Sequence, residues 1–163
     1  MKNLILLSLQ VLSSLFMFYL AFRWWIKPRL DKLPQYEALL PVVFYHGIRF
    51  VGLTFMADGQ FYDSFPDNMA AAIGIGDYIV SILALLTAIA LKSKTKIAIP
   101  LVWTTIVLGI VDFFNAFRLL GGQEFWKYDI EGTWYFFLFI GPITIITSIY
   151  IIKRLIQPLP ENS

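Results

Sequence analysis

Four residues that can carry charge lie inside otherwise apolar stretches of this chain: His46, Arg49, Asp77 and Asp112. Arg49 and the chain's only histidine share one stretch, Leu39 to Met56. An arginine surrounded by hydrocarbon costs about 3 kcal/mol even on the mildest scales, so it needs a partner of opposite charge. Because the two aspartates are the available partners, the sequence predicts a buried ionic cluster.

The charges of this cluster do not balance. One arginine and two aspartates leave a net negative charge unless the cluster also holds a proton, so either His46 is protonated or one carboxyl is neutral. Carboxyl and imidazole groups that share protons can relay them or act as an acid–base pair. The candidate catalytic residues are therefore His46, Asp77 and Asp112. The candidate set for ligand binding or proton relay is His46, Arg49, Asp77, Asp112, Asn115 and Gln10.

Other chemistry is less well supported by the residues present. A single histidine and the absence of cysteine leave too few ligands for a zinc site, and one histidine cannot ligate haem from both sides. We therefore predict neither a metal nor a cofactor. A purely structural role is the alternative for the cluster, because a buried ion pair can fix the register between helices without further function.

Composition predicts the class of protein that holds these charges. Hydrophobic residues make up 58% of the 163-residue chain and charged residues only 15%, and the mean hydropathy is +0.70. These values are typical of an all-α, polytopic integral membrane protein whose main partner is the lipid bilayer. The formal net charge of +2 is too small to indicate a nucleic-acid partner.

Apolar runs of about 20 residues, the length that crosses a bilayer, divide the chain into spans. A single transmembrane domain covers residues 1–163, with five predicted helices at about 3–22, 38–57, 69–91, 97–120 and 133–152. The run at 38–57 is the least apolar, because Pro41, Gly47 and Gly52 accompany its two polar residues. The alternative is a bundle of four spans with a re-entrant segment at 38–57.

Charges in the connections favour five spans. Basic and acidic connections alternate along the chain, which by the positive-inside rule places the N-terminus outside and the C-terminus in the cytoplasm, in a bacterial inner membrane. The basic residues are Arg23, Lys27, Arg29, Lys32, Lys92, Lys94, Lys96, Lys153 and Arg154. The acidic connections carry Asp58, Asp63, Asp67, Glu124, Asp129 and Glu131, with Lys127.

Depth and helical spacing bring the polar residues together. Arg49, Asp77 and Asp112 each lie about eight residues from the predicted outer end of their span, or roughly 12 Å at the rise of an α-helix. Small and polar residues share one face in each of three spans. These faces are Ala70, Gly74, Asp77, Ser81, Ala84 and Ala88; Thr105, Gly109, Asp112 and Asn115; and Val42, His46, Arg49 and Leu53. Gln10, with Ser13 and Ser14, and the pair Gly141-Pro142 lie at similar depth in the other two spans.

Three kinds of function fit such a cluster. The first is binding of a small polar or anionic ligand, in a receptor-like protein or a proton-linked transporter, which would need a homo-oligomer because no internal repeat is evident. The second is an intramembrane enzyme in which His46 and an aspartate act on a lipid-soluble substrate. The third is an accessory subunit of a membrane complex. A water path would indicate transport, an aromatic-lined lateral opening would indicate an enzyme, and a charge facing outward would indicate a subunit.

Overall fold

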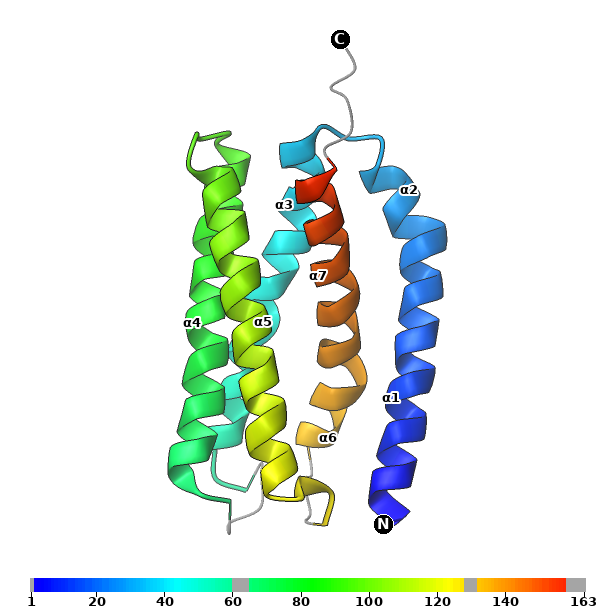
Figure 1. Cartoon of the computed structure of the whole chain (residues 1–163), viewed down its shortest axis with the longest axis vertical. Coiled ribbons are helices and arrows are strands. Elements are labelled where there is room, and N and C mark those ends of the chain that lie inside the picture. The colour runs from blue at the N-terminus through cyan, green and yellow to red at the C-terminus, as the bar shows by residue number, and fades with distance from the viewer. Residues whose placement is uncertain (1, 60–64, 128–131, 158–163) are drawn as a thin grey trace.

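The computed structural model describes residues 2–59, 65–127 and 132–157, which fold into a bundle of roughly parallel and antiparallel helices (Figure 1). Five helical segments of this described part are long and apolar enough to cross a membrane, as predicted. They are Lys2–Leu30, Gln35–Met56, Asp67–Lys92, Ala98–Gly122 and Thr133–Ile156. The first and last segments extend beyond the predicted spans at 3–22 and 133–152, into the basic residues that follow them.

Two of these segments are uninterrupted α-helices, and three change helix type along their length. The uninterrupted helices are α4 (Asp67–Lys92) and α5 (Ala98–Gly122). The first segment comprises α1 (Lys2–Ala21), the π-helix η1 (Phe22–Ile26) and α2 (Lys27–Leu30). The second comprises α3 (Gln35–Tyr45) and the 3-10 helix η2 (His46–Met56), and the last comprises α6 (Thr133–Tyr135), the π-helix η4 (Phe136–Ile140) and α7 (Gly141–Ile156). A short 3-10 helix, η3 (Phe125–Lys127), follows α5.

The second segment is one continuous helix, so the re-entrant alternative for 38–57 does not describe it. Its first 11 residues rise as an α-helix and its last 11 as a 3-10 helix. At about 1.5 Å and 2.0 Å per residue, the segment is about 38 Å long, which exceeds the roughly 30 Å of a hydrocarbon core. The tighter helix thus gives a segment of only 22 residues ample length.

The 3-10 stretch also changes which residues share a face. Side chains three residues apart eclipse one another in a 3-10 helix. His46, Arg49, Gly52 and Phe55 accordingly form one buried row. The predicted face was right for His46 and Arg49 and wrong for Leu53, which is 38% exposed, because that prediction assumed the α-helical period throughout.

The helices pack in two groups (Figure 1). One group contains α3, α4 and α5, the other contains α1 and α7, and the two groups meet where α7 packs against α3 and α5. Helix α4 lies against η2, α3 and α5, while α7 lies against α1 and α3. The small-residue face of α4 is buried along its whole length, as predicted, from Ala70 to Ala88. Close approach of η2 and α5 to α4 depends on this face, because small residues let helix backbones come near one another.

Two apolar clusters fill the bundle, one toward each end. One cluster includes Leu39, Val102 and Ile151, and the other includes Phe55, Ile73 and Leu120. Several buried polar residues line the contacts of η2, α4, α5 and α7, and we refer to them as the polar layer: His46, Arg49, Asp77, Ser81, Thr105, Thr144 and Thr147.

The connections sort by charge at the two ends of the bundle. Those after α2 and α4, together with the end of α7, lie at one end and carry the basic residues (Figure 1). The start of α1 and the connections after η2 and α5 lie at the other end. Arg154 belongs to α7 and is buried there, where its Nη2 donates to the Leu33 carbonyl at 2.5 Å.

Pro142 explains the irregular start of the last segment. Proline has no N–H to donate to the carbonyl four residues earlier, which here belongs to Leu138. Ser14 of α1 donates its hydroxyl to that carbonyl instead. Just before the proline, the backbone widens into η4, where the Gly141 N–H bonds the Phe136 carbonyl five residues back. Side chains of neighbouring helices commonly satisfy carbonyls that a proline frees.

Candidate functional site

The guanidinium group of Arg49 lies at the centre of the polar layer and joins η2 to α4 and α5. Its Nε donates to Asp77 Oδ1 at 2.6 Å and its Nη2 to Asp112 Oδ2 at 2.5 Å. Its Nη1 donates to the Gly109 carbonyl at 3.0 Å. The predicted ionic cluster is thus present, and both aspartates bind the arginine. We refer to Arg49, Asp77 and Asp112 as the ionic triad.

Burial isolates the ionic triad from solvent. Arg49 and Asp77 are only 3% and 4% exposed, and the side chain of Asp112 is 13% exposed. The two carboxyl groups bind the same guanidinium and interact electrostatically with each other. Because two negative charges face one positive charge, a neutral triad requires one additional proton. Asp112 is the most exposed member of the ionic triad.

Glycines make room for each charged side chain on a neighbouring helix. A Cβ at Gly52 of η2 would overlap Asp77, and a Cβ at Gly76 of α4 would overlap Asp112. A Cβ at Gly109 of α5 would lie 3.0 Å from Arg49 Nη1. Each of the three helices therefore contributes one charged residue and one glycine that receives a charge from a neighbour. The glycine at position 76 is therefore a packing residue.

His46 is buried near the triad but bonds to a different helix. Its Nε2 is 3.1 Å from Thr147 Oγ1 of α7, and it is only 2% exposed. The Thr147 hydroxyl also donates to the Ile143 carbonyl at 2.8 Å. When that bond forms, the threonine oxygen accepts a hydrogen bond from Nε2. Within the described residues His46 pairs with neither aspartate, so the predicted acid–base pair is not assembled.

Two further candidates, Gln10 and Asn115, bond outside the ionic triad. Gln10 Oε1 accepts a hydrogen bond from Trp134 Nε1 at 2.9 Å, since α1 packs on the last segment and not on α4. Asn115 Oδ1 accepts one from Arg118 Nη2 at 2.9 Å. Although Asn115 lies one helical turn from Asp112, it does not bond Arg49.

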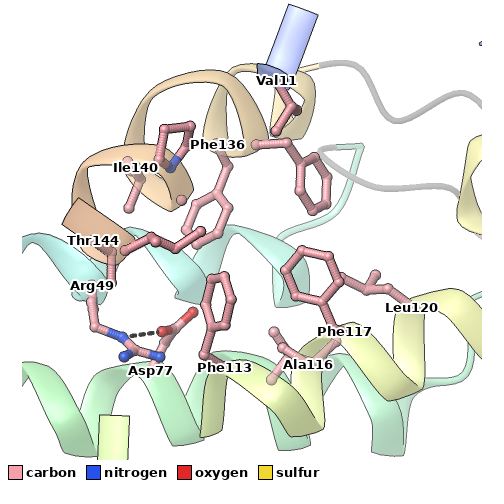
Figure 2. A pocket seen from close by; sticks show the side chains of 15 residues that line it. Val11, Arg49, Asp77, Phe113, Ala116, Phe117, Leu120, Phe136, Ile140 and Thr144 are labelled. Atoms are coloured by element: carbon pink, nitrogen blue, oxygen red, sulfur yellow. Dashed lines mark hydrogen bonds and ion pairs between the residues drawn. The ribbon is translucent and has the colours of Figure 1, made fainter. Parts of the chain in front are cut away.

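A cavity of about 70 Å³ adjoins the ionic triad (Figure 2). Arg49 and Asp77 form its polar end. Aromatic rings from two helices form its walls, and the principal ones are Phe113 and Phe117 of α5 and Phe136 and Phe137 of η4. Val11 of α1 closes the far side. The α5 wall reaches the outer surface of the bundle, because Phe117 is 56% exposed.

Sequence reasoning missed the residues that build these walls. The α5 wall consists of Phe113, Ala116, Phe117 and Leu120, which follow the spacing of one α-helical face. That spacing was the available signal, but aromatic residues are equally typical of a lipid-facing surface.

Thr144 supplies a third polar group to the cavity. It is only 6% exposed and lines the cavity on the α7 side (Figure 2). Its hydroxyl is near that of Tyr45 but forms no hydrogen bond of ordinary geometry with the described residues.

The fold and the site define an all-helical bundle with membrane-length helices and a buried ionic triad. Residues 6–156 match the family model described as "Domain of unknown function (DUF8737)", and the chain belongs to this family. No curated protein and no solved structure matches the chain.

Substituting the glycines should displace the charges they receive. We expect Gly52→Ala and Gly76→Ala each to lower the free energy of unfolding by about 1–3 kcal/mol, because the added methyl group overlaps a carboxyl held in place by Arg49. Gly121→Ala is the matched control, since a Cβ there meets nothing within 4 Å. Thermal unfolding in nanodiscs measures the difference, and equal stability of all three variants would contradict the packing described.

Removing the arginine should cost more than removing either carboxylate. Arg49→Met leaves two acids facing each other in a buried site, and we expect a loss of about 3–5 kcal/mol. Asp77→Asn should be less well tolerated than Asp112→Asn, because Asp77 is the more deeply buried of the two. The same unfolding assay compares the three variants, and equal tolerance of the two asparagine variants would refute the ranking.

Proposed function

We propose that this protein binds a small amphipathic ligand within the membrane and takes up a proton as it binds. The observation that carries this proposal is the cavity, whose aromatic walls lead to Arg49 and Asp77. Pockets for small ligands are usually apolar and have a few polar groups that fix orientation. One anionic or polar group would contact Arg49 and Thr144 within the cavity of about 70 Å³. The apolar or aromatic body, which is too large for this volume, would extend along the phenylalanine walls toward the exposed side of Phe117.

The proposal places the five long helices across a bacterial inner membrane. Basic connections gather at one end of the bundle, which is then the cytoplasmic end, and the N-terminus faces outside. Exposed Trp24 and Trp25 lie toward the basic end, where they would form part of an aromatic belt. The cavity lies toward the opposite end, because Val11 and Phe136 line it. A ligand would therefore enter from the outer half of the bilayer, beside Phe117.

Charge balance supports proton uptake. The ionic triad is neutral when it holds one proton, and an anion bound to Arg49 would add one negative charge in a buried place. A second proton on the triad would restore neutrality, since an uncompensated charge there costs several kcal/mol. In this proposal Arg49 binds the anionic group, and Asp77 and Asp112 hold the protons.

The contacts of the polar residues favour this proposal over the other two functions. The enzyme hypothesis needs His46 beside an aspartate, whereas His46 bonds Thr147. The accessory-subunit hypothesis needs a charge that faces outward, whereas Arg49 and Asp77 are buried. Transport of the ligand with its proton is the form of this function that would require a homo-oligomer, because five helices offer no internal repeat for alternating access.

Binding of benzoate to the protein in nanodiscs tests the proposal. Benzoate has an aromatic ring and a carboxylate, and benzyl alcohol is its uncharged counterpart. Titration calorimetry in buffers of different ionisation enthalpy should show about one proton taken up per benzoate and none per benzyl alcohol. Ala116→Phe should weaken benzoate binding about tenfold or more, because the larger side chain fills the cavity.

Val111→Phe is the matched control, because Val111 is an exposed residue of the same helix and does not line the cavity. It should bind benzoate as the unmodified protein does. Benzoate binding without proton uptake would refute the proton linkage. Equal binding by the two phenylalanine variants would refute the cavity as the binding site.

Cysteine labelling tests the proposed orientation. The chain has no native cysteine, so single substitutions give an unambiguous signal. We expect a membrane-impermeant maleimide to label Asp58→Cys and Glu124→Cys from outside intact cells, and to label Lys94→Cys only after the cells are opened. Labelling of Lys94→Cys in intact cells would reverse the orientation.

A further inference from the structure

A second and larger hollow lies between the first and last helical segments, at the basic end of the bundle. Its volume is about 620 Å³. Residues of α1, η1 and α2 form one side, and residues of α7 form the other. We refer to it as the basic groove. It shares no residue with the cavity beside the ionic triad.

The rim of the basic groove carries excess positive charge. Arg23, Lys27 and Lys153 line it together with a single acid, Asp31. That acid is already occupied, since Lys27 forms an ion pair with it and Tyr150 Oη donates to it at 3.3 Å. Within the described residues, neither Arg23 nor Lys153 forms an ion pair. Two cations are therefore available to an anionic ligand.

The wall of the groove below this rim is apolar. Phe22 packs edge-on against Tyr150, with ring centroids 5.4 Å apart. Ile146 and Ile149 continue the wall along α7, and Ile149 is 50% exposed. A cationic rim above an apolar strip matches a molecule with an anionic head and a hydrocarbon chain.

The backbone at the groove is irregular in a way that often accompanies function. The π-helix η1 includes Phe22 and Arg23, and the Lys27 N–H bonds the Phe22 carbonyl five residues back. Short π-helical stretches occur frequently at functional sites. The other π-helix, η4, lines the cavity beside the ionic triad. Both hollows are thus built at a π-helical stretch.

We propose that the basic groove binds a phospholipid whose headgroup carries a net negative charge. The phosphate would lie against Arg23 and Lys153, and one acyl chain would lie along Ile146 and Ile149. Basic pockets between membrane helices on the cytoplasmic side recognise anionic lipid headgroups in this way. The inference rests on the proposed insertion in a bilayer with the basic end at the cytoplasmic surface, but it concerns a site separate from the ligand cavity.

Native mass spectrometry with defined lipids tests this site. The purified protein is exchanged into micelles that contain equal amounts of phosphatidylglycerol, which is anionic, and phosphatidylcholine, which is zwitterionic. We expect the protein to retain phosphatidylglycerol preferentially, and Arg23→Gln with Lys153→Gln to reduce that preference about tenfold. The matched control, Lys92→Gln with Lys96→Gln, removes the same charge from exposed residues at the same end, outside the groove, and should retain the preference.

Any other outcome would refute the proposed lipid site in the basic groove. An equal loss in both double variants would mean diffuse attraction to the basic end, and no loss in either would mean that the groove is not involved. Displacement of the lipid by millimolar glycerol 3-phosphate would mean a site for a soluble phosphate ester. The groove variant should still bind benzoate, so failure of the lipid site is distinguishable from failure of the proposed ligand cavity.

Discussion

The bonds that the Arg49 guanidinium makes are the interactions on which the rest of the bundle depends. It bonds a carboxylate on α4, a carboxylate on α5 and a backbone carbonyl on α5, while its own Cα belongs to η2. Three helices are therefore fixed relative to one another by one side chain. Because the guanidinium is almost completely buried, water cannot take the place of these hydrogen bonds if they are lost.

The backbone around this group is shaped to receive it. The 3-10 helix places Arg49 and Gly52 on one eclipsed face, so that the arginine reaches α5 while Asp77 lies against the glycine. The glycine at position 109 admits the guanidinium, and its carbonyl accepts a hydrogen bond from it. Charge and close packing are thus coupled, because moving any one of these helices would unpair a buried ion. The cavity lies next to these packed helices, and Arg49 and Asp77 form part of its lining.

Much of this arrangement could be predicted from the sequence. Apolar runs predicted five membrane-length helices, and counting depth along them placed Arg49 and both aspartates at the same level, without showing which aspartate pairs with the arginine. These predictions succeed because hydrophobic length and the cost of a buried charge are strong constraints that need no knowledge of neighbouring helices.

The parts that could not be predicted depend on contacts between helices. The 3-10 helix has no distinct sequence signal, so an α-helical period was assumed and Leu53 was placed on the wrong face. The partner of His46 is Thr147, which lies 101 residues away along the chain. The walls of the cavity come from separate helices whose phenylalanines look like lipid-facing residues in the sequence. In each case the sequence shows the type of residue but not which residues of other helices it contacts.

The most direct test of the central claim compares the removal of one charge with the removal of the whole ionic triad. Arg49→Met alone leaves two unpaired acids, whereas Arg49→Met combined with Asp77→Asn and Asp112→Asn leaves no charge to compensate. If mutual charge pairing holds the helices together, the triple variant should recover most of the unfolding free energy that the single variant loses. A triple variant no more stable than the single one would contradict the account.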